Sequence, residues 1–175
     1  MDSNQGHSPG KHLGQGMLIA CFALGLAALT LYFDGWLAEQ ANPNQSPDYR
    51  ETDSGFREVV LQRNRQGHYV ANGEVNGVAV TFLLDTGATD VAIPADVARE
   101  AGLQSGIAGR ANTANGVITV YTTQVDELVL GNIVLNNVSA SITPSMGGDT
   151  ILLGMSALKQ IEFTQRGNTL TLRQI

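Results

Sequence analysis

The chain lacks the features on which several common classes of function depend. Cys21 is the single cysteine among 175 residues, so neither an intrachain disulfide nor a thiolate metal site can form. Charged residues make up 15% of the chain, against a usual share of about 25%. The 10 Lys and Arg form no cluster, and with 16 Asp and Glu the net charge is −6. We therefore do not expect nucleic-acid binding through a basic surface.

Histidine and chain length set further limits. His7 and His12 stand in a polar stretch, and His68 has no second His or Cys at ligand spacing, so no metal or other cofactor is expected. A chain of 175 residues is too short for two large domains with separate cores. Its 20 Gly and many small polar residues favour strands and turns over long helices.

One long apolar segment stands near the start of the chain. Residues 13–33 carry no charge, and as a helix rising 1.5 Å per residue they match a hydrocarbon core of about 30 Å. A cleaved signal peptide is the alternative, but its apolar region normally has only about 7–15 residues and ends at a small-x-small site. The apolar core here, Met17–Phe33, is longer, and no clean Ala-x-Ala follows it. We expect an uncleaved transmembrane anchor, with Trp36 at the interface.

The segments around this anchor complete the domain organisation. Residues 1–12 are polar and without periodicity, which predicts a flexible tail. Lys11 is the basic residue close to the entry side, so that side is expected to be cytoplasmic. Residues 34–54 hold two prolines and many short polar side chains, which predicts a flexible linker. Residues 55–175 then form the working domain.

Turn signals follow one another closely in the working domain. Asn-Gly and Gly-Asn pairs separate short runs of Val, Ile, Thr and Leu, the pattern of β-hairpins. A mainly β domain is expected. Two short helices are predicted, over 94–101, with Pro at the start and Gly102 just past the end, and over 155–160. Strands are predicted over 68–75, 78–84, 117–130, 133–142, 149–153 and 168–173.

The chemical signal lies in the segment Phe82–Pro94, which reads Phe-Leu-Leu-Asp-Thr-Gly-Ala-Thr-Asp-Val-Ala-Ile-Pro. A carboxylate directly after a buried apolar strand is costly unless donors, a partner or a proton compensate its charge. Thr86 offers a hydroxyl, and Gly87 lets the backbone turn so that amide groups approach Asp85. An Asp-Thr-Gly turn is by itself a weak signal, because Asp and Gly favour turns anywhere.

Two further segments strengthen the signal. Residues 150–158 read Thr-Ile-Leu-Leu-Gly-Met-Ser-Ala-Leu, an apolar strand that ends in Gly and opens a helical turn. Residues 110–121 form a hairpin pattern with Ala-Asn-Gly at its tip and β-branched arms. With these motifs in this order, the sequence resembles the retropepsin-like aspartic proteases, and most closely their bacterial membrane-anchored branch, over roughly residues 69–172.

The resemblance implies a fold and a set of site residues. The fold is a mainly β, retropepsin-like acid-protease β-barrel with a flap hairpin and one or two short helices. Met155 stands where many viral relatives carry Arg, which leaves the dimer contacts open. By the resemblance, Asp85 is the catalytic aspartate, supported by Thr86, Gly87, Ala88 and Thr89; Asn112, Thr113, Ala114, Asn115 and Gly116 form the flap; Leu152, Leu153 and Gly154 form the strand beside the site.

The chemistry of this family needs two carboxyl groups that share one proton. The chain holds one Asp-Thr-Gly, so a two-fold homodimer is expected, in which each copy supplies Asp85. The strand over 168–173 is expected to be an exposed edge that pairs across this dimer. The predicted function is that of an aspartic endopeptidase acting on polypeptides without a metal or other cofactor. The anchor helix would contact lipid in a bacterial inner membrane and hold the protease domain in the periplasm.

Other functions explain the sequence less fully. A non-catalytic peptide-binding or scaffold module of the same fold, displayed at the membrane, is the main alternative, because fold alone does not prove activity. The intact Asp-Thr-Gly favours the enzyme, since a binding cleft gains nothing from a costly buried acid. An unrelated extracytoplasmic β-sandwich would leave Asp85 unexplained. Serine chemistry lacks a Gly-x-Ser-x-Gly motif, and Cys21 lies in the anchor.

Overall fold

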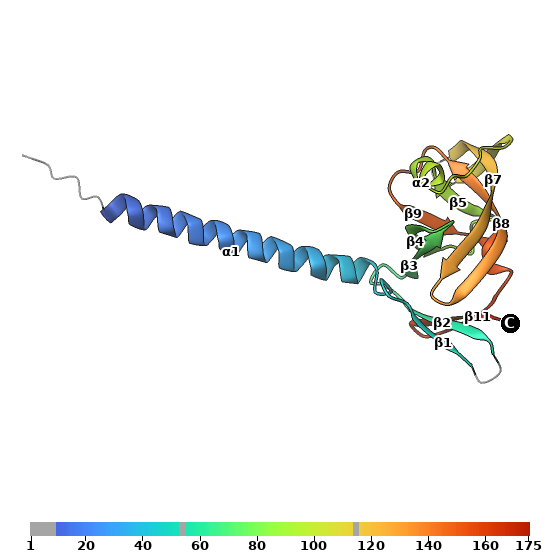
Figure 1. The fold of residues 1–175 in the computed structure, drawn as a ribbon, viewed down its shortest axis with the longest axis horizontal. Coiled ribbons are helices and arrows are strands. Elements are labelled where there is room, and N and C mark those ends of the chain that lie inside the picture. Colours follow the sequence, from blue (N-terminus) through green and yellow to red (C-terminus); the bar gives the residue numbers. More distant parts are fainter. Residues whose placement is uncertain (1–9, 53–54, 114–115) are drawn as a thin grey trace, which may run out of the picture. The chain divides into compact units, whose positions relative to one another are not determined.

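The structure is a computed structural model that describes residues 10–52, 55–113 and 116–175 (Figure 1). The chain divides into two compact units, Met1–Ala38 and Glu39–Ile175. The first unit contains most of one long helix, and the second contains all of the strands.

Helix α1 spans Gly10–Ala41. Within the described residues it is the one helix long and apolar enough to cross a membrane, over Gly14–Ala41, and its most apolar 18 residues have a mean hydropathy of 2.1. A signal sequence near an N-terminus can also be long and apolar enough to meet this criterion. The hydroxyl of Thr30 donates to the carbonyl of Leu26 at 2.8 Å, so this polar group is satisfied inside the helix.

The larger of two sheets has seven strands in the order β3-β4-β9-β5-β8-β7-β6. Strand β9 comes from late in the chain and lies between β4 and β5, parallel to β4 and antiparallel to β5. The loop from β4 to β5 therefore has to pass over the end of β9. The strands are β3 (Val70–Val75), β4 (Val78–Leu84), β5 (Val91–Pro94), β6 (Ala108–Thr113), β7 (Gly116–Leu130), β8 (Ile133–Thr143) and β9 (Thr150–Leu153).

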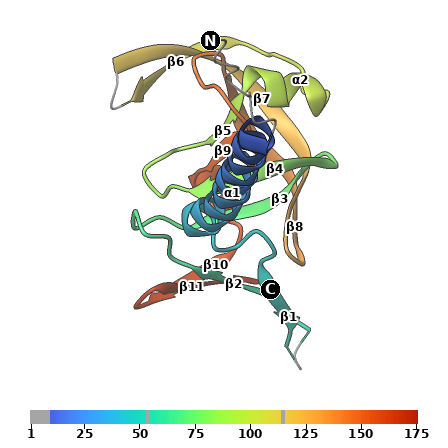
Figure 2. The same cartoon turned by 90° about the vertical axis from the view of Figure 1, so that its left-hand side faces the viewer.

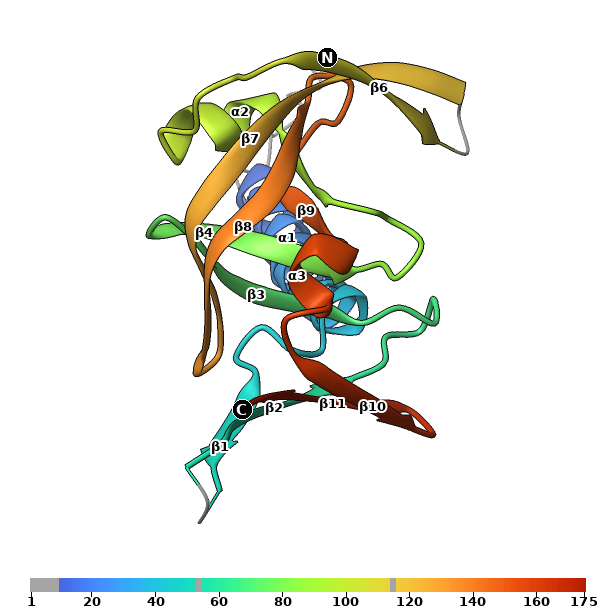
Figure 3. The same ribbon diagram turned by 90° about the vertical axis from the view of Figure 1, so that its right-hand side faces the viewer.

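The smaller sheet has four antiparallel strands in the order β1-β2-β11-β10. It lies below the larger sheet in Figures 1 to 3. Strand β11 pairs on both sides, so the expectation that the C-terminal strand is an exposed edge is wrong. The edges are β1 and β10, whose residues are all exposed. The strands are β1 (Asp48–Glu51), β2 (Arg57–Gln62), β10 (Glu162–Arg166) and β11 (Thr169–Gln174).

One hydrophobic core joins the two sheets. Buried side chains of β2 and β11 belong to the same cluster as the apolar side chains of the larger sheet. Two short helices cover its margins, α2 (Ala95–Glu100) and α3 (Met155–Leu158). The largest fully buried apolar side chains include Phe82, Leu61, Ile93, Ile151 and Leu172.

The domain is mainly β with two short helices, as the sequence predicts. Strands β3, β4, β7, β8, β9 and β11 lie within one or two residues of the predicted bounds. Strands β1, β2, β5 and β10 were not predicted. Strands β1 and β10 are exposed along their whole length and carry no alternation of apolar and polar residues, and β5 has only four residues.

The segment expected to be a flexible linker, residues 34–54, is mostly ordered in the structure. Helix α1 continues to Ala41, Asn44 is buried, and β1 pairs with β2 along its full length. Tertiary hydrogen bonds outweigh the local preference of the two prolines and short polar residues for an irregular chain. Residues 53 and 54, and residues 1–9 of the expected tail, lie outside the described residues.

Candidate active site

Asp85 opens the loop that joins β4 to β5, here called the Asp85 loop (residues 85–90). Because β9 runs parallel to β4 in the register Leu84 to Leu153, the two strands end side by side. The amide of Asp85 donates to the carbonyl of Leu153 at 3.1 Å, which continues the pairing past the end of β4. Asp85 thus leaves a strand with neighbours on both sides, which fixes the position of its backbone.

The carboxylate of Asp85 is held by its own loop. The amide of Gly87 donates to Oδ1 of Asp85 at 2.8 Å, and the amide of Ala88 donates to the carbonyl of Asp85 at 3.2 Å. A Cβ at Gly87 would lie 3.1 Å from the same carboxylate oxygen, so a larger residue there would crowd it. The side chain is half-buried, which leaves the carboxylate both oriented and reachable by a ligand.

Gly154 allows the close packing below the Asp85 loop. A Cβ at this position would lie 2.2 Å from the carbonyl oxygen of Asp90 and 2.8 Å from that of Ala88. Real Cβ atoms do not come this close to backbone, so only glycine fits. This close contact explains why the apolar strand β9 is followed by a glycine.

Helix α3 fixes the far side of the loop. Its first two amides donate to the loop, from Met155 to the carbonyl of Ala88 at 2.8 Å and from Ser156 to that of Thr89 at 2.9 Å. The hydroxyl of buried Ser156 accepts from the amide of Val91 at 3.0 Å and donates to the carbonyl of Ser139 at 2.6 Å. One hydroxyl thus ties α3 to β5 and β8.

A cavity of about 280 Å³ lies beside Asp85. Phe163 and Gln165 of β10 face it, together with their register partners Leu172 and Leu170 of β11. The hydroxyl of Tyr69, whose side chain is 8% exposed, has no hydrogen-bond partner among the described residues. The full lining is Tyr69, Leu84, Asp85, Thr86, Leu158, Phe163, Gln165, Leu170 and Leu172.

The expected flap is a hairpin of β6 and β7, with Thr113 paired to Gly116 at its described end. The hydroxyl of Thr113 donates to the carbonyl of Gly116 at 2.8 Å, and Gly116 has a φ of +110°, a conformation that favours glycine. Residues 114 and 115 lie outside the described residues. In Figures 2 and 3 strand β6, the Asp85 loop and the β10–β11 turn project to the same side of the domain.

The predicted site residues therefore fall into two groups. The structure brings the Asp85 loop and residues 152–154 together by direct contact. Of the expected flap residues, Asn112 and Thr113 of β6 pair with Val117 and Gly116 of β7, whereas Ala114 and Asn115 lie outside the described residues. These described residues also contain no group of three or more His, Cys, Asp or Glu side chains that would hold a metal ion.

Known proteins share these features. The family described as gag-polyprotein putative aspartyl protease matches residues 71–160, which include the Asp85 loop, the β6–β7 hairpin and β9. The chain belongs to this family of retropepsin-like aspartic proteases. The match confirms the resemblance that the motifs indicated.

Two curated relatives match about two thirds of the chain. An uncharacterized protein in the cobV 5′ region of Sinorhizobium sp. is 35% identical over 127 residues, 70% of this chain and 54% of that protein. The uncharacterized protein RP867 of Rickettsia prowazekii is 29% identical over 123 residues, 66% of this chain and 50% of that protein. The chain thus spans about half the length of these curated relatives.

A solved structure supports the fold. The crystal structure of a retropepsin-like aspartic protease from Rickettsia conorii superposes with a TM-score of 0.55 at 25% identity, over 74% of this chain and 95% of that one. The expected fold class, mainly β and retropepsin-like with two short helices, is confirmed.

Part of the candidate site of this retropepsin-like family member was missed from the sequence. Tyr69, Phe163 and Gln165 line the cavity, but none stands near the Asp-Thr-Gly motif in the chain. Phe163 and Gln165 are two residues apart, which places both side chains on one face of β10. This spacing was the one signal in the sequence that could have pointed to these two residues. It indicates a place in the cavity lining only when β10 is known to pair with β11.

Proposed function

We propose that the chain is a membrane-anchored aspartic endopeptidase in which Asp85 acts together with Asp85 of a second copy. The observation that carries this proposal is the half-buried Asp85 carboxylate, oriented by the amide of Gly87 and open to the cavity beside it. Asp85 is the one acid that lines this cavity within the described residues. A second carboxyl group therefore has to come from another chain.

Two facing carboxyl groups would hydrolyse a peptide bond as follows. One Asp85, as a carboxylate, takes a proton from a water molecule while the water oxygen bonds to the peptide carbonyl carbon. The other Asp85, protonated, gives its proton to the carbonyl oxygen. The resulting tetrahedral species breaks its C–N bond as the amine nitrogen takes up a proton, and an acid and an amine leave. The support roles of Thr86, Gly87, Ala88 and Thr89 belong to this proposal.

Three observations support the dimer and the flap. Edge strand β10 is exposed and carries Phe163, which is 41% exposed, on the cavity side. Thr86 is exposed at the same cavity, next to the acid. The β6–β7 hairpin projects on the side of the Asp85 loop, where it would close over a bound peptide and exclude water (Figure 3).

Helix α1 is the proposed anchor, with the Lys11 end in the cytoplasm and the protease domain in the periplasm of a bacterial inner membrane. Its length and apolar composition support this role. Anchoring two copies in one membrane would raise their local concentration and favour the dimer. Carbonate extraction of membranes tests the anchor, because an uncleaved span stays in the pellet whereas a chain released by signal cleavage does not.

The decisive experiment compares the wild type with Asp85→Asn and Asp126→Asn. Asp126 is an exposed acid on β7, so its change is a matched control. We expect Asp85→Asn to abolish cleavage of a peptide library, because the amide cannot share the proton, and Asp126→Asn to cleave at the wild-type rate. Cleavage by Asp85→Asn would overturn the assignment and leave a peptide-binding module of the same fold.

The dimer is tested in the same assay by dilution. When dimers are scarce, the rate of cleavage should rise with the square of protein concentration. A strictly linear dependence down to concentrations at which the protein sediments as a monomer would contradict the shared site.

A further inference from the structure

Hydrogen bonds from a buried asparagine attach the chain segment after α1 to the protease domain. Asn44 is 4% exposed. Its side-chain amide donates to the carbonyls of Gln62 at 2.9 Å and Val70 at 2.6 Å, and its side-chain oxygen accepts from the amide of Gln62 at 2.6 Å. Gln62 belongs to β2 and Val70 to β3, so this single side chain joins the two sheets.

Two more asparagines of the domain hold the residues on either side. The amide of Asn64 donates to the carbonyl of Ala41 at 2.9 Å. Asn72 accepts from the side chain of Asn42 at 2.8 Å and donates to the carbonyl of Gln45 at 3.1 Å. We name residues 41–45 the clasp. Their hydrogen bonds all lie within the unit Glu39–Ile175.

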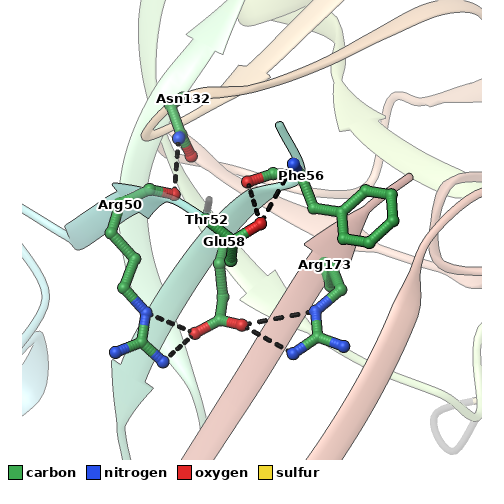
Figure 4. Close-up of polar contacts among 6 residues, drawn as sticks. All are labelled: Arg50, Thr52, Phe56, Glu58, Asn132 and Arg173. Atoms are coloured by element: carbon green, nitrogen blue, oxygen red, sulfur yellow. Dashed lines mark hydrogen bonds and ion pairs between the residues drawn. The ribbon is translucent and has the colours of Figure 1, made fainter. Parts of the chain in front are cut away.

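Strand β1 continues the attachment beyond the clasp. Its residues pair with β2 from Asp48 to Glu51. Buried Glu58 of β2 binds Arg50 of β1 on one side and Arg173 of β11 on the other, as Figure 4 shows. The side-chain amide of Asn132 also donates to the carbonyl of Arg50 at 3.0 Å. The domain therefore holds the chain from the last residue of α1 to Glu51.

The clasp shortens the stretch of chain that could act as a tether to residues 34–40. A flexible linker over residues 34–54 would extend as far as about 70 Å at about 3.4 Å per residue. The structure instead has helix from Asp34 to Ala41, a rise of about 12 Å at 1.5 Å per residue. The headgroup region on each side of a bilayer is itself about 5–7 Å thick. If the apolar residues up to Phe33 span the hydrocarbon, residues 34–41 reach only a few ångströms beyond the headgroups before the clasp begins.

We propose that the substrates of this enzyme are membrane proteins cut in extramembrane segments close to the bilayer surface. This inference rests on the proposed function of a membrane-anchored peptidase. A domain held at the surface meets segments next to a membrane span at high effective concentration, and this concentration falls roughly as the −3/2 power of the length of chain that separates cleavage site and membrane.

The test uses the full chain in lipid vesicles with single-span reporters. One reporter carries a cleavage sequence about 10 residues beyond its span and another about 60 residues beyond it, and a soluble peptide carries the same sequence. The sixfold difference in length predicts cleavage of the near site about 15-fold faster. Equal rates at the two sites, with the soluble peptide cleaved, would overturn the inference alone; failure to cleave any of the three would overturn the proposed function.

An insertion checks that the short connection is the cause. Twenty Gly and Ser residues between Asp34 and Gly35 release the domain while keeping the clasp intact, and should reduce the near-to-far ratio to a few-fold. The same insertion between Gly147 and Gly148, where the backbone has open space around it, is the control and should leave the ratio unchanged. An unchanged ratio after the first insertion would show that the connection does not restrict the substrate.

Discussion

Replacing Gly154 by Ala probes the contact that positions the Asp85 loop. The added Cβ would lie 2.2 Å from the carbonyl oxygen of Asp90 and 2.8 Å from that of Ala88. The φ of −86° and ψ of −174° at Gly154 are extended values that any residue adopts, so the penalty is steric and not conformational. Either the Asp85 loop or the end of β9 must move.

The magnitude follows from what the new methyl group meets. Overpacking a close-packed interior costs about 1–3 kcal/mol. Both obstacles here are backbone atoms of a loop that the amides of Met155 and Ser156 also hold, so we expect the upper end, about 3 kcal/mol. For a urea m-value of about 2 kcal/mol per molar, the midpoint of unfolding falls by about 1.5 M.

The assay is urea unfolding of the full chain in detergent, followed by the near-ultraviolet circular dichroism of its tyrosines. Hydrogen exchange at the amide of Asp85, which donates to Leu153, reports the loop directly. Gly147→Ala is the matched control, because Gly147 has open space and no positive φ, and its midpoint should equal that of the wild type. If Gly154→Ala also unfolds at the wild-type midpoint, the packing below the loop is not as described.

Three further perturbations test other parts of the domain. The hydrogen bond from Arg173 is the largest cause that lowers the pKa of Glu58 below its ordinary value of 4.5; its stabilising effect is therefore complete above about pH 4.5 and lost as the pH falls further. The urea midpoint should drop between pH 5 and 3 in the wild type and less in Glu58→Gln, and equal slopes would contradict this. Tyr69→Phe removes a hydroxyl without a partner among the described residues, so the midpoint should stay or rise, whereas a fall would reveal a missed hydrogen bond. Ser156→Ala leaves the amide of Val91 and the carbonyl of Ser139 unpaired, at a cost of about 1–3 kcal/mol; unchanged exchange at Val91 would refute this role.

Much of the site could be predicted because its motifs are local. Asp85, Thr86 and Gly87 are consecutive, and the turn that brings the amide of Gly87 to the carboxylate needs no distant residue. Hairpins such as β3–β4 join neighbouring strands through two-residue turns at Asn-Gly pairs, which the sequence marks directly. Their bounds were close for this reason.

The rest depends on residues far apart in the chain. Strand β11 lies between β2 and β10, so its pairing needs a segment more than 100 residues earlier, and no local pattern announces it. Asn44 reads as part of a polar linker until the carbonyls of Gln62 and Val70 are placed beside it. A buried amide gains its stabilising effect only from such partners.

The sequence alone determined the family signature, the apolar helix and the mainly β character, because short motifs and the spacing of apolar residues carry that information. Only the tertiary structure decided that β11 lies inside the smaller sheet, with β1 and β10 at its edges, and that the clasp occupies part of the segment expected to be a linker. Each of these rests on backbone hydrogen bonds or close contacts between distant segments, and a polar residue shows nothing of such partners until the chain has folded.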